Sequence, residues 1–230
     1  MNQRMLSSTF ARLASVMTLA AIAPVAAQRP AAPYPAMAPL SQYLMDRGAE
    51  IALARTAAPP SISGDAGVLV LTRSGYETAA ASKNGFVCMV ERSWAGPDDA
   101  QFWNPKIRSP NCFNPQAVQA YVPIARMKAR LILAGTSKSE MFRAVIAARD
   151  AHTFPAPAVG AMCYMMSKQQ YLNDDGKAWH PHVMFFVPRG EAARWGADLP
   201  GSPVLSGDEP EAGITVLMVP VKHWSDGTAG

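Results

Sequence analysis

Two histidines separated by a single residue are the side chains of this 230-residue chain that point most directly to chemistry. His180 and His182 flank Pro181, and the apolar stretch 183–187 follows them. Side chains two positions apart on an extended strand leave the same face of that strand. Pro181 favours an extended His180, because the proline ring disfavours the helical conformation of the preceding residue. The spacing therefore predicts two neighbouring imidazoles where a strand begins.

Two neighbouring imidazoles form half of a zinc-type metal site, which needs at least one more protein ligand. On this interpretation His180 and His182 hold a divalent metal ion that His223 or Asp175 helps to coordinate. The metal would activate a water molecule, and the protein would be a metal-dependent hydrolase. Further candidates for the third ligand are Asp174, His152 and Cys163.

A second interpretation makes the same residues the lining of a small-ligand pocket. Trp179 precedes the histidine pair, and Met184 and Phe186 continue the face of His182 as an apolar layer. One imidazole would then bond to a backbone carbonyl while the other stacks on Trp179. A third interpretation is a structural or interaction protein of the cell envelope without catalysis.

The rest of the sequence lacks familiar signatures of catalysis. It has neither a Gly-x-Ser-x-Gly turn nor a glycine-rich phosphate loop. Ser167-Lys168 lacks the longer pattern that surrounds a serine nucleophile with a lysine base. Glu91-Arg92, at the end of a predicted strand, is expected to be a surface pair on opposite faces. The net charge of +4 comes without a cluster of Lys and Arg, which argues against a nucleic-acid partner.

The first 27 residues have the features of a cleaved export signal. Arg4 and Arg12 precede an apolar run and a small-residue cleavage site that ends at Ala27. Cleavage there removes two arginines and no acidic residue, which lowers the net charge from +4 to +2. A Pro/Ala-rich lead-in over 28–37, expected to be flexible, would follow. We therefore expect a periplasmic or secreted protein with no integral membrane segment in its mature chain.

Three cysteines in an exported chain make a disulfide possible. Cys88 and Cys112 are the favoured pair, because a bridge between them would close the proline-rich segment 93–115. The spacing also permits pairings through Cys163, and three free thiols are the alternative. If one bridge forms, Cys163 is the cysteine expected to remain free.

Residues 38–230 are expected to form one α+β domain. Strands are predicted over 68–72, 76–81 and 86–92 as a meander closed by an Asn84-Gly85 hairpin, and over 161–167, 182–187 and 214–221. Helices are predicted over 40–54, over 116–134 with a break near Pro123, and after a Ser137–Glu140 capping box. The segments 93–115 and 200–213 are expected to be loops. The pattern predicts a largely antiparallel sheet of about five to six strands with two to three packed helices.

Several stretches of the chain resemble a family of exported bacterial proteins without an assigned function. They are SISGDAGVLVL, NGFVCMVERSW, FWNPKIRSPNCFNP, AMCYMMSKQQYLNDDGKAWHPHVMFF and WGADLPGSPV, and the resemblance extends over nearly all of the chain after the export signal. The resemblance implies export and a single domain, and it implies no activity or catalytic residue.

Overall fold

The structure is a computed structural model that describes residues 33–96, 100–174 and 179–230. The predicted export signal, 1–27, and the candidate metal ligand Asp175 lie outside these ranges. The described residues form one sheet of eight strands with five α-helices and three short 3-10 helices. The strands are β1 (Gly67–Thr72), β2 (Gly75–Ala80), β3 (Val87–Glu91), β4 (Ser109–Phe113), β5 (Met162–Met165), β6 (His182–Pro188), β7 (Leu205–Glu209) and β8 (Ile214–Pro220). The helices are α1 (Arg47–Arg55), α2 (Pro60–Ser63), α3 (Pro115–Ala120), α4 (Val122–Leu133) and α5 (Lys138–Asp150), with η1 (Leu40–Gln42), η2 (Ser93–Ala95) and η3 (Ala192–Trp195).

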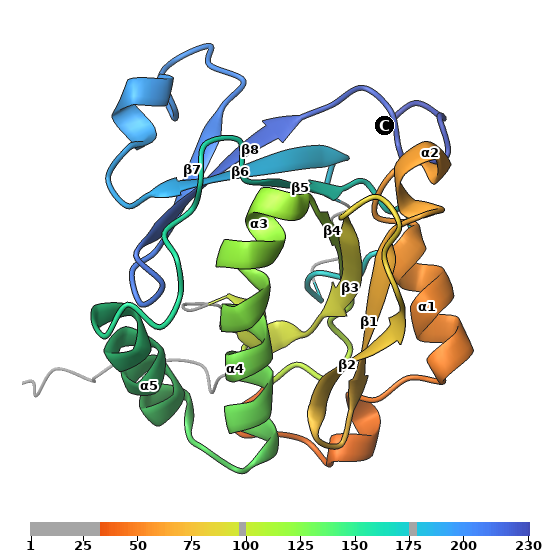
Figure 1. The fold of residues 1–230 in the computed structure, drawn as a ribbon, viewed down its shortest axis with the longest axis vertical. Helices are drawn as coiled ribbons and strands as arrows, with labels where there is room; N and C mark the ends of the chain where they lie inside the picture. The colour runs from red at the N-terminus through yellow and green to blue at the C-terminus, as the bar shows by residue number, and fades with distance from the viewer. Residues whose placement is uncertain (1–32, 97–99, 175–178) are drawn as a thin grey trace, which may run out of the picture. The chain divides into compact units, whose positions relative to one another are not determined.

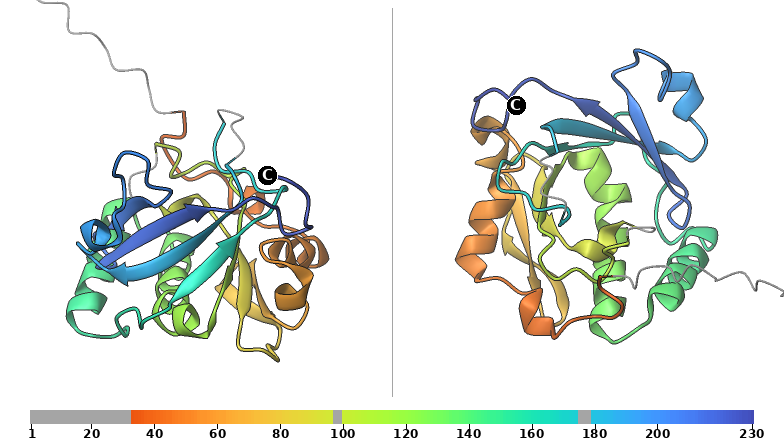
Figure 2. Two further views of the ribbon diagram at one scale, coloured as in Figure 1. Left: turned by 90° about the horizontal axis from the view of Figure 1, so that it is seen from above. Right: turned by 180° about the vertical axis from the view of Figure 1, so that it is seen from behind.

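The strands lie in the order β2-β1-β3-β4-β5-β6-β8-β7, and every neighbouring pair is antiparallel except β1 with β3. The sheet curves around α3 and α4, while α1 covers the opposite face of β1 and β3 (Figure 1). The further views in Figure 2 show the same division of the helices between the two faces. Strand β1 contributes side chains to both faces of the sheet, because successive side chains of a strand point to opposite faces. Val68 and Val70 pack on the α1 side, whereas Leu69 and Leu71 join the larger core.

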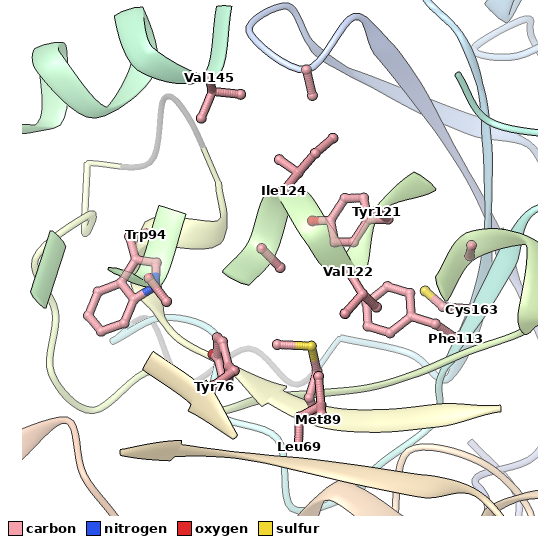
Figure 3. Packing of buried hydrophobic residues seen from close by; sticks show 14 of the residues in the cluster. Leu69, Tyr76, Met89, Trp94, Phe113, Tyr121, Val122, Ile124, Val145 and Cys163 are labelled. Atoms are coloured by element: carbon pink, nitrogen blue, oxygen red, sulfur yellow. The ribbon is translucent and has the colours of Figure 1, made fainter. Parts of the chain in front are cut away.

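The larger core fills the concave face of the sheet. Figure 3 shows Leu69 and Met89 on the strands with Val122 of α4 facing them, while Tyr121 and Ile124 extend on the other side of the helical segment. The ring of Tyr121 stacks on those of Phe113 and Phe186, at centroid distances of 5.2 and 4.7 Å. Burying each large apolar side chain stabilises the fold by about 1.5–3 kcal/mol. These rings therefore fasten β4 and β6 to the junction of α3 and α4.

The predicted class, α+β with a mostly antiparallel sheet, is right, but the predicted numbers of strands and helices were wrong. Two strands lie in segments expected to be loops. Strand β4 contains Pro110 and Asn111, residue types that strands usually exclude. It pairs with β5 only at Cys112 and Phe113, so Pro110 lies beyond the end of that ladder. Strand β7 is at the edge of the sheet, where polar residues such as those of Leu205–Glu209 are tolerated without apolar alternation.

The predicted meander was also wrong. A meander would place β2 between β1 and β3, but β3 pairs directly with β1 and runs parallel to it. Asn84-Gly85 therefore lies in a longer connection instead of closing a hairpin between β2 and β3. The amide of Asn84 donates to the carbonyl of Ile62 at 2.8 Å and accepts from the N–H of Phe86 at 3.0 Å. These bonds anchor the connection to α2.

The α-helices are more numerous than predicted because the segment 116–134 forms two of them and α2 was not predicted. The segment 40–54 forms η1 and then restarts as α1, with the Asp46 side chain as the N-cap. The break expected near Pro123 falls at Tyr121 and separates α3 from α4. The fifth helix, α2, begins at Pro60. Across the described ranges, none of the helices is long and apolar enough to cross a membrane.

Two local predictions are confirmed. The side chain of Ser137 accepts a hydrogen bond from the backbone N–H of Glu140. The side chain of Glu140 accepts one from the backbone N–H of Ser137, as a capping box requires. Cys88 and Cys112 form a disulfide between paired positions of β3 and β4, and Cys163 is free and buried.

Candidate functional site

The three residues predicted to line a ligand pocket lie together at one end of the sheet. Trp179, His180 and His182 line a cavity of about 360 Å³, which we call the His182 pocket. Its other lining residues are Asn173, Leu205, Met218 and Pro220. The ends of three adjacent strands set this geometry. His182 opens β6 opposite Pro220 of β8, and Leu205 opens β7 opposite Met218 of β8.

The imidazole of His182 is 4% exposed and has a defined tautomer. Its Nδ1 atom lies 2.8 Å from the carbonyl oxygen of His180. Because a carbonyl only accepts, Nδ1 carries the proton of the neutral ring, and Nε2 is left as an acceptor. Within the described part of the chain, Nε2 has no hydrogen-bond partner. The predicted bond of one imidazole to a backbone carbonyl is therefore confirmed, but the ring that lies beside Trp179 is that of His182 as well, and not of the other histidine as predicted.

Burial favours the neutral form of the His182 imidazole. Removing the ring from water lowers its pKa, and the bond to the His180 carbonyl opposes this effect more weakly. A pKa below the ordinary value keeps the imidazole neutral at neutral pH. The indole of Trp179 lies beside it, with ring centroids 5.9 Å apart and a tilt of 48°. Trp179 and Leu205 are 42% and 43% exposed, so large apolar side chains stand where the pocket meets solvent.

A carboxylate next to the pocket holds the neighbouring segments together. Asp174 accepts hydrogen bonds from the hydroxyls of Tyr34 and Tyr171, from Lys106 Nζ at 3.0 Å and from Asn104 Nδ2 at 3.3 Å. The bonds from Tyr171, Tyr34 and Lys106 hold the pKa of Asp174 far below its ordinary value. The ionised carboxylate thus ties the residue that precedes it, Asn173, to the loop before β4.

Two other candidate metal ligands, His223 and His152, do not line the pocket with His180 and His182. His223 follows β8 and forms a bridge near the end of the chain. His152 lines a different cavity of about 370 Å³, beside α5. Among the side chains of 33–96, 100–174 and 179–230, no group of three His, Cys, Asp or Glu is placed to hold a metal ion. With Asp175 outside these ranges, the metal site remains a prediction.

A buried ion cluster lies on the concave face, where the sequence carried no signal of a site. Lys128 of α4 has a side chain that is 2% exposed, and its Nζ lies 3.2 Å from Glu209 Oε2 and 2.9 Å from Glu211 Oε1. It also donates to the carbonyl of Ala95 at 3.0 Å. Burial disfavours the charge of Lys128, but the two carboxylates outweigh burial and raise its pKa. The cluster joins α4 to β7 and to η2.

A buried carboxyl group lies close to this cluster. Glu91 and Arg92 were expected at the surface, but they are only 6% and 1% exposed. Glu91 Oε2 accepts from Asn111 Nδ2 at 2.7 Å. Burial, reinforced by the charge of Glu209, raises the pKa of Glu91 to about 7. Burial also raises the pKa of the nearby Cys163 thiol, which leaves it protonated and unreactive.

Comparisons with known proteins identify no relative of this chain. No protein-family model, curated protein or solved structure matches it. Its function must therefore be inferred from the arrangement of its own residues.

Proposed function

We propose that this protein binds a small, largely apolar ligand in the His182 pocket. The observation that supports the proposal is a cavity of about 360 Å³ with the partly exposed Trp179 and Leu205 at its mouth. Cavities of about 300–1,000 Å³ that are mainly apolar and aromatic, with few polar groups, are typical small-molecule sites. Met218 and Pro220 extend the apolar lining, and His182 supplies one oriented polar atom.

The tautomer of His182 limits which ligands can form a hydrogen bond in the pocket. With Nδ1 bonded to the His180 carbonyl, the neutral ring has an acceptor at Nε2 and no second donor. A ligand hydroxyl or N–H group satisfies this atom, whereas a carboxylate does not. An apolar molecule that carries one hydrogen-bond donor is therefore the ligand that this pocket fits best.

Binding of a simple alcohol tests this proposal. The wild-type protein should bind 1-octanol saturably, as measured by protein-observed NMR titration. Trp179→Ala should weaken that binding about tenfold, because the lost contact with the indole contributes at least ~1.4 kcal/mol. His182→Phe should also weaken it, because phenylalanine keeps a ring in place and removes the Nε2 acceptor.

A second exposed tryptophan provides the matched control. Trp195 is 48% exposed, stacks on Phe185 and does not line the His182 pocket. Trp195→Ala should leave the affinity for 1-octanol unchanged. Absence of saturable binding to the wild-type protein, or equal affinities of the Trp179 and Trp195 variants, would refute the proposal.

We also propose that the protein is exported to an oxidising compartment. Two observations support this: the signal-like pattern of residues 1–27 and the disulfide between Cys88 and Cys112. Protein recovered from the periplasm or medium of a producing bacterium should begin at Gln28. When denatured without reductant it should take up one alkyl group, at Cys163, and after reduction three. Intact-mass spectrometry that finds Met1 retained, or three alkylated thiols before reduction, would contradict export or the disulfide respectively.

A further inference from the structure

Another cavity, of about 400 Å³, lies between helices α3 and α4 and the strands β1, β2 and β3. We call it the Arg126 pocket, after the charged residue in its lining. It is near the β2 edge of the sheet, whereas the His182 pocket is near the β7 edge, and the two share no described residue. Its lining residues belong to these five elements or directly follow β2, so none is next in the chain to an undescribed residue.

The floor of the Arg126 pocket is apolar and belongs to the larger core. Val122 of α4 faces Leu69 of β1 (Figure 3), and both are buried in that core. Val87 and Val118 pack against the core and are only partly buried. All four residues line the cavity. An apolar ligand that covers the two partly exposed valines removes further apolar surface from water, which favours binding.

A β-bulge shapes the strand side of the pocket. The register shifts between Val68 and Leu69, whose partners on β2 are Ala80 and Thr78, so the ladder leaves Ala79 unpaired. Such a bulge bends its strand, and bulges are frequent next to functional sites. Thr78 and Ala80 flank the bulge, and both line the cavity. The irregular end of β2 therefore forms one wall of the pocket.

A guanidinium belongs to the opposite wall. Arg126 follows Val122 by one helical turn, so the two side chains share a face of α4. Helical side chains tilt toward the N-terminus of their helix, which directs Arg126 back along the wall that Val122 forms. Arg126 is exposed, and in the part of the chain that the structure describes it forms no hydrogen bond or ion pair. A permanent cation thus lines a largely apolar cavity without a counter-ion from these residues.

A second arginine adds to this positive charge. Arg130 follows Arg126 by one more turn, is exposed, and its Cβ atom lies close to Gly75, where β2 begins. Among the residues described, Arg130 has no ion-pair partner either. The acidic residue of β2, Glu77, points to the opposite face of the sheet, because the preceding Tyr76 belongs to the larger core. Side chains one turn apart have Cβ atoms about 6 Å from each other, so both guanidinium groups can reach one anion.

We propose that the Arg126 pocket binds a small amphipathic anion. The apolar part of the ligand covers the valines of the floor, and its carboxylate or phosphate head accepts hydrogen bonds from Arg126 and Arg130. The planar guanidinium group forms paired hydrogen bonds with either kind of head. This site goes beyond the proposed function, because it is separate from the His182 pocket and selects the opposite head group. Nε2 of His182 requires a hydrogen-bond donor, whereas the two arginines require an acceptor.

Probes that share an alkyl chain and differ in the head group test the inference. Octanoate, octyl phosphate and 1-octanol are titrated below their micelle concentrations, and NMR follows the backbone amides of Thr78, Ala80 and Val118. At least one of the two anions should shift these amides saturably, and the tighter one identifies the preferred head. 1-Octanol should bind here at least about tenfold more weakly, because it lacks charge-assisted hydrogen bonds. Acetate should also bind at least about tenfold more weakly than octanoate, because it lacks the apolar chain.

Two arginine variants complete the test. Arg126→Gln should weaken binding of the tighter anion about tenfold, and unchanged amide shifts outside the pocket would show that the variant is folded. Arg143→Gln removes the same charge from an exposed position of α5 outside the cavity, and it should bind the anion as the wild-type protein does.

Three results would overturn the inference. They are the absence of saturable shifts with both anions, equal anion affinities of Arg126→Gln and the wild-type protein, and binding of 1-octanol in this pocket as tight as that of the anion. The binding of 1-octanol to the His182 pocket is read from other amides, including that of Leu205. Failure of this site and failure of the proposed function are therefore distinguishable.

Discussion

Replacing Lys128 with methionine should lower the free energy of unfolding by about 3–5 kcal/mol, the usual effect of removing one partner from a buried ion pair. Methionine keeps the length of the side chain but leaves the carboxylates of Glu209 and Glu211 without their cation, although their side chains are only 12% and 4% exposed. The carbonyl of Ala95 loses its donor as well. Denaturant unfolding followed by circular dichroism measures the difference.

Two further variants separate the buried pair from a general effect of losing a lysine. Lys83 lies 3.8 Å from Asp65, and their side chains are 82% and 62% exposed. Lys83→Met should cost less than about 1 kcal/mol, because exposed ion pairs contribute little. Adding Glu209→Gln and Glu211→Gln to Lys128→Met should restore much of the lost stability. If Lys128→Met is no more destabilising than Lys83→Met, the cluster does not stabilise the fold as described.

Glu91→Gln should remove a dependence of stability on pH. In the folded protein, burial raises the pKa of Glu91 to about 7 from an ordinary value of 4.5. Between these values the folded state holds a proton that the unfolded state has released, so a rise in pH favours unfolding. Relative to Glu91→Gln, the wild-type protein should therefore lose up to ~3 kcal/mol of stability between about pH 4.5 and about pH 7.

The difference between the two proteins isolates this group, because other titrations, including that of His182, occur in both. Glu77 provides a control of opposite sign, since hydrogen bonds from Ser74 and Thr72 lower the pKa of that exposed carboxyl. Glu77→Gln should lose stability relative to the wild-type protein as the pH rises through the pKa range of Glu77. A pH profile of Glu91→Gln that runs parallel to the wild-type profile would show that Glu91 titrates normally.

Predictions from the sequence were correct where a structure depends on residues that are close together in the chain. Ser137 and Glu140 form the capping box that their spacing predicts, and the run after His182 forms the predicted strand. His180 and His182 both line the His182 pocket, but β6 begins only at His182, so the two-residue period of a strand does not account for the position of His180. The capping box and the strand depend on residues a few positions apart, so the sequence contains what determines them.

The buried charges could not be predicted in this way. Lys128 meets Glu209 and Glu211 across separations of 81 and 83 residues, and only the folded topology brings them together. Glu91 was predicted to be a surface residue because nothing near it in the chain shows that Asn111 will bond to it and that Lys128 and Glu209 will lie close by. The environment of a buried charge depends on distant partners that no local pattern encodes.

The position of the His182 pocket at the strand ends has a consequence for how this protein can diverge. Leu205, Met218 and Pro220 line the His182 pocket from the ends of β7 and β8, while the centres of these strands maintain the register. The disulfide of Cys88 and Cys112 belongs to the smaller core on the opposite face, with α1. Residues at strand ends and in loops can change without disturbing the ladder. Over evolutionary time, descendants of this chain can therefore exchange one ligand for another while they keep the same fold.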